Sequence, residues 1–166
     1  LVEMATMEAM AGKVPDETLM EKYAEISKES LIKVVNDTDK RKGYQEDAKS
    51  FINIRVKQYW DMGLGMYETK NYEMAMMGFM GAYSVSEFIG VDYEDAKVNA
   101  MAMFNVVTDS LLNSGQLDKT EEIAIAAQEA FGKDISILTT LINVALKQGD
   151  KEKSEKYINQ ALELDP

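Results

Sequence analysis

Apolar residues recur along this chain at the three- and four-residue spacing of amphipathic helices, and almost nowhere at the two-residue spacing of strands. Polar or glycine-containing turns separate the apolar runs. Helices are predicted over residues 2–11, from Pro15 to the polar run at 36–43, and over 45–69, 72–89, 93–113, 117–131, 135–148 and 151–164. The sequence therefore predicts an all-α fold of seven or eight helices.

The last helix pair repeats the pair before it. A shift of 34 residues places Gly115 on Gly149, Thr120 on Ser154 and Ala127 on Ala161. A third copy lies earlier in the chain, where Gly63, Ala75, Phe79 and Ala82 match the same pattern. The step from Ala75 to Thr120 is 45 residues rather than 34, so the extra residues around 85–95 are expected to lengthen helices or the loop between repeats.

These positions resemble the tetratricopeptide repeat (TPR) family, whose unit is an antiparallel helix pair of about 34 residues. The family has small residues at the eighth, twentieth and twenty-seventh positions, a large apolar residue at the twenty-fourth and proline at the thirty-second. In the last copy, Ile158 and Pro166 hold the last two of these positions. The resemblance implies one domain, residues 1–166, built as a right-handed α-solenoid. Residues 1–55 would be helices without a clear repeat signature, followed by three repeats at about 56–100 (with the insertion), 101–134 and 135–166.

Composition narrows the function further. The 166 residues include no cysteine and no histidine, which removes thiol nucleophiles, the usual zinc ligands and the commonest general base. A net charge of −11 repels nucleic-acid phosphates, and no apolar run is long enough to insert into a membrane. We therefore predict no catalytic residue, metal site or cofactor. The cell compartment stays open.

One loop superficially suggests calcium binding. Asp37 and Asp39 hold the first and third positions of an EF-hand loop. However, Lys42 stands where glycine is required, and Ala48 stands where a bidentate glutamate is required. A solvated turn is the better interpretation.

The family resemblance implies that the first helix of each pair lines a concave binding surface. The corresponding residues are Lys57, Trp60, Leu64 and Tyr67 in the first repeat, Asn105, Asp109, Leu112 and Asn113 in the second, and Ser136, Thr139, Asn143 and Lys147 in the third. Asn105 and Asn143 carry amides that could both donate to and accept from a peptide backbone, or could simply be solvated.

Two groups of side chains have alternative interpretations. Trp60 fits core packing and groove lining equally well. The chain has twelve methionines, concentrated in its middle third, and core filling is the expected role. As an alternative, Met76 or Met103 could reach the groove.

The sequence thus predicts a non-enzymatic module that binds a protein or peptide. The alternatives are an enzyme or small-ligand protein with a pocket between the N-terminal helices and the repeats, or a structural segment of a larger repeat protein. Some of Tyr157, Ile158, Leu162 and Leu164 are expected to form an open apolar face on the C-terminal helix, which suggests a homodimer through that helix.

Overall fold

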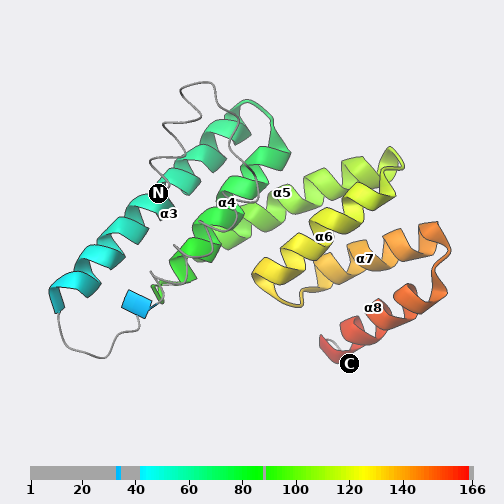
Figure 1. Ribbon diagram of the computed structural model, residues 1–166. Coiled ribbons are helices and arrows are strands. Elements are labelled where there is room, and N and C mark those ends of the chain that lie inside the picture. Colours follow the sequence, from blue (N-terminus) through cyan, green and yellow to red (C-terminus); the bar gives the residue numbers. More distant parts are fainter. Residues whose placement is uncertain (1–32, 35–41, 88, 165–166) are drawn as a thin grey trace, which may run out of the picture. The chain divides into compact units, whose positions relative to one another are not determined.

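Six helices make up the part of the chain that the computed structural model describes, residues 33–34, 42–87 and 89–164. They are α3 (Lys42–Glu68), α4 (Tyr72–Glu87), α5 (Glu94–Asn113), α6 (Leu117–Phe131), α7 (Ile135–Gln148) and α8 (Lys151–Leu164) (Figure 1). These residues include no strand, so the all-α prediction is confirmed for them. The chain divides into two compact units, Leu1–Ile52 and Asn53–Pro166, and the second holds the rest of α3 and all of α4 to α8.

The helices after residue 70 begin and end within two residues of the predicted boundaries. The predicted total of seven or eight is not reached, because all but residues 33–34 of the two helices expected before residue 36 lies outside the described residues, as do Asp37, Asp39 and Pro166. One boundary was wrong. Gly43 was placed in the polar turn but lies in the first turn of α3. The first N–H groups of a helix have no partner within it, so glycine and polar residues are tolerated there.

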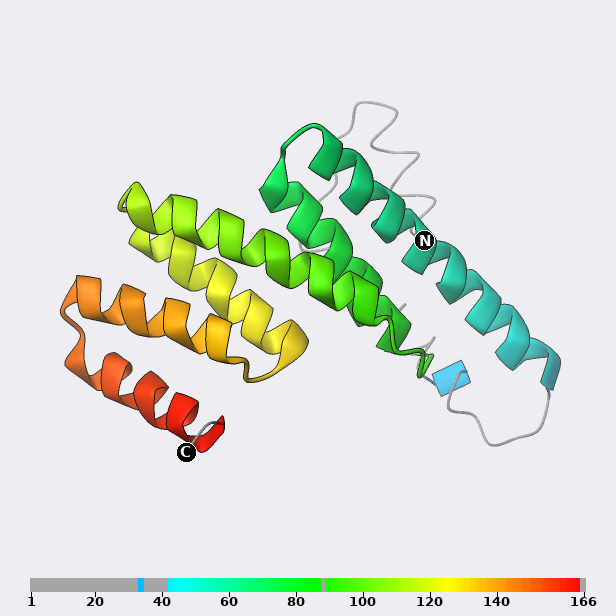
Figure 2. The same ribbon diagram turned by 180° about the vertical axis from the view of Figure 1, so that it is seen from behind.

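Each helix from α4 onward packs against the next one in the chain and runs in the opposite direction (Figures 1 and 2). Helices two apart also touch, since α4 contacts α6 and α5 contacts α7. One apolar core runs through all of these helices and includes Phe79, Phe104, Leu138, Leu141 and Tyr157. The described part of the unit is therefore held together by contacts between near neighbours in sequence.

The same backbone turn closes four helices. Lys70, Gly90, Gly115 and Gly149 each have a positive φ, between 62° and 76°. Their N–H groups donate to the carbonyl three residues back, and the following N–H donates to the carbonyl five residues back, at 3.2 Å after Gly90 and at 2.9 Å in the other three copies. This is the hydrogen-bond pattern of a left-handed helix cap. The 34- and 45-residue steps seen in the sequence therefore join equivalent turns.

The insertion lengthens a helix. α5 has 20 residues, against 14 in α7, and a short loop after α4 leads into it. Ala96 and Ala100, near its start, are fully buried. The extra residues thus extend the packed surface of α5 instead of forming a long loop.

Short side chains mark the closest helix approaches. Ala75, Ala82, Thr120 and Ala127 are fully buried, and Ser154 nearly so, as the repeat pattern predicts. The tightest crossing lies between α3 and α4. A Cβ built on Gly78 would lie 2.6 Å from the backbone nitrogen of Gly63, and one built on Gly63 would lie 2.6 Å from the Phe79 ring. The two backbones meet there, and the sequence analysis had identified only Gly63.

This crossing gives a test with a matched control on the same helix pair. Gly78→Ala should lower the free energy of unfolding by ~1–3 kcal/mol, because the new methyl meets backbone that cannot rotate away. Gly65→Ala has open space around its Cβ and should instead raise it by ~0.5–1 kcal/mol, because alanine favours the helix. Urea unfolding measures both. Equal effects in the two variants would show that α3 and α4 do not approach this closely.

The turn at Lys70 allows a second test. A left-handed backbone costs a residue with a side chain about 1–2 kcal/mol, and glycine avoids this cost. Lys70→Gly should therefore raise the free energy of unfolding by ~0.5–1 kcal/mol, whereas Gly149→Ala at the equivalent turn should lower it. Thermal and urea denaturation measure both changes. A loss of stability in Lys70→Gly would contradict the equivalence of the turns.

Candidate functional site

The twelve predicted groove residues all lie on α3, α5 and α7, and none is buried. Nine are exposed, namely Lys57, Leu64, Tyr67, Asn105, Asp109, Asn113, Thr139, Asn143 and Lys147. Trp60, Leu112 and Ser136 are half-buried. We call this set the A-helix surface. Its side chains offer apolar, amide and charged groups to solvent.

Two members of the A-helix surface meet across helices. The Ser136 hydroxyl on α7 donates to the side-chain oxygen of Asn105 on α5 at 2.6 Å. Ser136 is held in place because its backbone N–H donates to the Asp134 carboxylate, which caps the start of α7. No other two members are hydrogen-bonded to each other in the part of the chain that the structure describes. The amide oxygen of Asn105 therefore contributes to a structural contact, while Asn143 is an exposed amide.

Trp60 is a packing residue. Its ring lies 5.1 Å from the Phe79 ring on α4 and 5.1 Å from the Tyr93 ring just before α5, measured between centroids. Such tilted aromatic pairs stabilise cores and interfaces. Of the two interpretations of Trp60, the structure favours packing, although the residue is only half-buried.

The methionines include both buried and exposed side chains. Met76 and Met103 are both buried in the core, so the suggestion that either reaches the groove was wrong. Met74 and Met77 are exposed instead, and they lie on α4 rather than on a helix of the A-helix surface.

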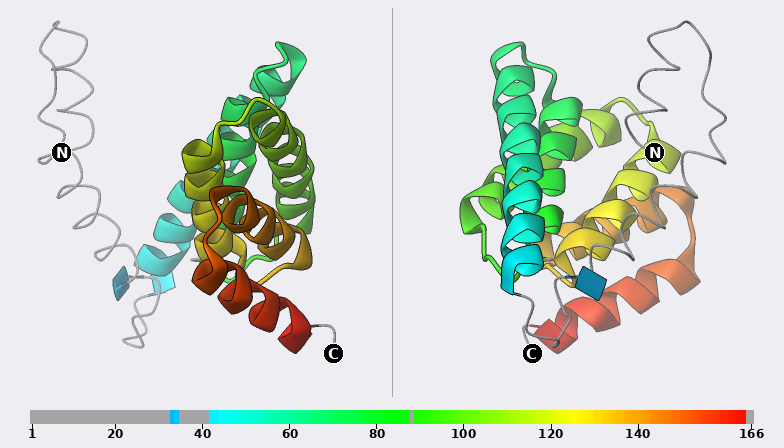
Figure 3. Two further views of the ribbon diagram at one scale, coloured as in Figure 1. Left: turned by 90° about the vertical axis from the view of Figure 1, so that its right-hand side faces the viewer. Right: turned by 60° about the vertical axis from the view of Figure 1, so that its left-hand side comes forward.

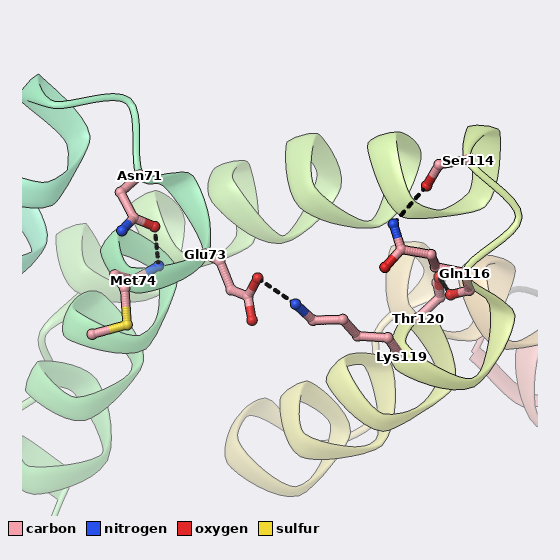
Figure 4. Close-up of polar contacts among 7 residues, drawn as sticks. All are labelled: Asn71, Glu73, Met74, Ser114, Gln116, Lys119 and Thr120. Carbon is pink, nitrogen blue, oxygen red and sulfur yellow. Dashed lines mark hydrogen bonds and ion pairs between the residues drawn. The ribbon is translucent and has the colours of Figure 1, made fainter.

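Ion pairs join alternate helices, and sequence reasoning missed them. Lys119 on α6 pairs with Glu73 on α4 at 2.8 Å (Figure 4), and Lys153 on α8 pairs with Glu121 on α6 at 2.5 Å. Lys119 and Lys153 are 34 residues apart and so occupy equivalent positions in the repeat. This equivalence was the one sequence signal that could have pointed to the two ion pairs. The acidic partners do not occupy equivalent positions, so no pattern pointed to them.

Glu121 is the more buried partner of its pair. The hydrogen bond from Lys153 lowers the pKa of the Glu121 carboxyl, burial opposes this, and a hydrogen bond from Gln148 adds to the lowering. The same contact with Glu121 raises the pKa of the Lys153 ammonium. Both shifts favour the charged forms, so the pair ties α6 to α8 at neutral pH.

Carboxylates surround two tyrosines near the start of α5. Burial is the main cause that raises the pKa of Tyr83, followed by Glu87, and burial followed by Asp95 raises that of Tyr93. Both phenols therefore stay protonated at neutral pH. They can donate hydrogen bonds but are not poised as bases.

A shallow open hollow of about 470 Å³ lies beside the turn between α5 and α6. It is lined by Gly115, Gln116, Leu117, Asp118, Lys119 and Gln148. Figure 4 shows that Gln116 donates to the Ser114 hydroxyl on one side of this turn, while Lys119 reaches across to Glu73. The hollow was not predicted. Its polar lining suits water or a polar side chain better than an apolar ligand.

Among residues 33–34, 42–87 and 89–164, no three acidic side chains gather in an arrangement that could hold a metal ion. The helices described there are also too short or too polar to cross a membrane. No protein-family model matches the chain, and no curated protein or solved structure is significantly similar to it. The resemblance to TPR proteins therefore stays a prediction.

The Glu121 pair predicts a pH dependence. Because the folded-state pKa lies below the ordinary value of about 4.5, the contribution of the pair is complete above that value. It is lost as the pH falls through the folded-state pKa. Glu121→Gln should therefore be less stable than wild type at pH 7, and this difference should shrink steadily below pH ~4.5.

Glu122→Gln is the matched control, since Glu122 is exposed on the same helix and forms no ion pair within the described residues. Its unfolding free energy, measured in urea from pH 7 to 3, should follow that of wild type. A difference in Glu121→Gln that is constant with pH would show that Lys153 does not hold the carboxylate.

Proposed function

We propose that the protein is a non-enzymatic interaction module of the TPR type, a right-handed stack of helix pairs that binds a peptide or partner protein along its A-helix surface. The observation that carries this proposal is the spacing of the left-handed turns at Lys70, Gly115 and Gly149, which follows the 45- and 34-residue steps of the sequence repeat. These three turns join α3 to α4, α5 to α6 and α7 to α8, which are the pairs expected from the repeat. The same turn also ends α4 at Gly90, whereas the N–H of Gly132 after α6 donates to the carbonyl four residues back.

Contacts between alternate helices support the stacked arrangement. The bond between Ser136 and Asn105 joins the first helices of two successive pairs. The ion pairs Lys119–Glu73 and Lys153–Glu121 join the second helices of successive pairs. A regular stack places first helices beside first helices, and so forms a continuous surface from α3 to α7.

The chemistry of the A-helix surface suits an extended peptide. Leu64 and Tyr67 on α3 are exposed and can hold an apolar side chain. Asn143 on α7 is an exposed amide that can donate to a backbone carbonyl and accept from a backbone N–H. Asp109 and Lys147 add one charge of each sign. Such a surface combines backbone recognition with a preference for one apolar anchor.

The alternative of an enzyme or small-ligand pocket gains no specific support. The pocket was expected against the N-terminal helices, most of which lie outside the described residues. The hollow beside Gly115 has Asp118 and Lys119 as its only ionisable residues. No second function is therefore proposed.

The test uses peptides selected from a displayed random library on the wild-type protein, with affinities measured by calorimetry. Leu64→Ala and Asn143→Ala should each raise the Kd about tenfold or more, equivalent to ~1.4 kcal/mol. The matched controls are Met77→Ala on α4 and Asn159→Ala on α8, which remove exposed side chains of the same kinds elsewhere. They should change the Kd less than about twofold.

Two results would contradict the proposal. One is a library that yields no peptide bound by the folded protein. The other is a selected peptide whose affinity falls in Met77→Ala or Asn159→Ala but not in Leu64→Ala or Asn143→Ala, since the binding surface would then lie on the second helices.

A further inference from the structure

One flank of α6 holds the next helix pair. Its Glu121 accepts from Lys153 on α8, and the Gln128 amide donates to the Gln160 side chain on α8 at 3.4 Å. Between these two contacts, Ala124 is completely buried. Glu121, Ala124 and Gln128 therefore mark the flank through which a second helix receives the pair that follows it.

The same flank of α8 is open. Thirty-four residues further on, these positions are Glu155, Ile158 and Leu162. Glu155 is exposed, Ile158 is 39% exposed and Leu162 is 58% exposed. Two large aliphatic side chains thus stand where α6 has a buried alanine and a hydrogen-bonded glutamine. Of the four residues predicted for the apolar face on α8, Ile158, Leu162 and Leu164 are exposed, whereas Tyr157 is buried in the core.

The neighbouring helix has a matching open flank. The Asn105 contact with Ser136 identifies the side of α5 that faces α7, and Thr108, on that side, is almost fully buried. The position equivalent to Thr108 on α7 is Ile142, which is only half-buried. On the same helical stripe, seven residues before and four after it, Ile135 is 46% exposed and Leu146 is 60% exposed.

We call Ile135, Ile142, Leu146, Ile158 and Leu162 the end face. α7 and α8 form an antiparallel hairpin (Figure 3, left), so the two open flanks are adjacent. The exposed fractions of its four most exposed members add up to about two whole aliphatic side chains. That is roughly 300 Å² of apolar surface, within the size range of patches that mark interaction sites.

We propose that the end face binds the end face of a second copy of this chain, hairpin against hairpin, about a two-fold axis. In such a pairing the same patch occurs on both partners, so apolar meets apolar by symmetry. This inference goes beyond the proposed peptide binding and holds whether or not the A-helix surface binds a peptide.

The area decides how strong the dimer is. Two end faces bury roughly 600 Å² of apolar surface, and since apolar atoms form about 60% of an interface, the total is roughly 1,000 Å². This lies at the lower limit for a specific interface, where weak and transient complexes are found.

The charges beside the end face allow two copies to come into contact there. The chain carries a net charge of −11, which opposes contact between two copies over most of their surface. On α8 the end face is bordered by Lys151 and Glu155, which have opposite signs. These two charges cancel, so this border adds no net charge to the repulsion between two copies.

Sedimentation equilibrium of the full 166-residue chain tests the proposal. Wild type should shift from the 18.6 kDa monomer toward twice that mass between about 1 and 200 µM. Ile158→Glu combined with Leu162→Glu should raise the dimer dissociation constant at least 100-fold. The matched control, Met77→Glu with Ile125→Glu, adds the same charge at exposed apolar positions on α4 and α6 and should change it less than about threefold.

A second measurement keeps the test decisive if the double variant unfolds, which circular dichroism would reveal. The chain has no cysteine, so Leu162→Cys and Met77→Cys each introduce a single thiol. A short bis-maleimide should cross-link Leu162→Cys into covalent dimers at 100 µM protein and leave Met77→Cys monomeric.

Three results would overturn the proposal. These are a wild-type protein that stays monomeric at 200 µM, a dimer that resists the α8 substitutions, and equal cross-linking at the two cysteine positions. A monomer in which the Leu162→Cys thiol reacts far more slowly with a maleimide than the Met77→Cys thiol would show that another segment of the chain covers the end face.

Discussion

The close approach of paired helices is the constraint on which the rest of this structure depends. At Gly63 and Gly78 the backbones of α3 and α4 almost touch, and in later pairs Thr120, Ala127 and Ser154 leave similarly little room. Two helices can come this near only where both present short side chains. Once that spacing is set, Phe79, Phe104 and Leu138 can fill one core that passes from pair to pair. The left-handed turns then return each helix along its partner.

Much of this fold could be predicted, because helix boundaries and buried small residues leave periodic signals. Glycine followed by a polar residue marks the turns at Gly115 and Gly149, and the apolar spacing locates α4 to α8 within two residues. Lys70 escaped notice because a lysine carries no sign that its backbone is left-handed. Gly78 escaped because the repeat pattern assigns small residues to Gly63, Ala75 and Ala82, and a further glycine between them gains meaning only when α3 lies against it.

The candidate site was less predictable than the fold. Position within a repeat correctly selects residues that are accessible, yet it cannot tell whether an accessible group is already engaged. Asn105 and Asn143 look alike in sequence, but within the described residues only the Asn105 side chain is hydrogen-bonded to a neighbouring helix, because Ser136 lies opposite it. The packing roles of Trp60 and Met103 depend on their distances to Tyr93 and to the core, and sequence spacing does not encode these distances. The ion pairs of Lys119 and Lys153 were missed for the same reason.

The chain of neighbour contacts has a consequence for how the molecule comes apart. In the described residues, α8 is held by α7, by α6 and by Lys133 in the loop between them, while each inner helix has partners on both sides. Among α4 to α8, the opening of α8 therefore breaks the fewest contacts. Once α8 has opened, α7 is the terminal helix and can open next. Unravelling should begin at this end and move inward, so that backbone amides exchange in a gradient along the sequence. A molecule bound to α7 and α8 would therefore stabilise the whole stack, because it would slow the opening of α8 on which all later opening depends.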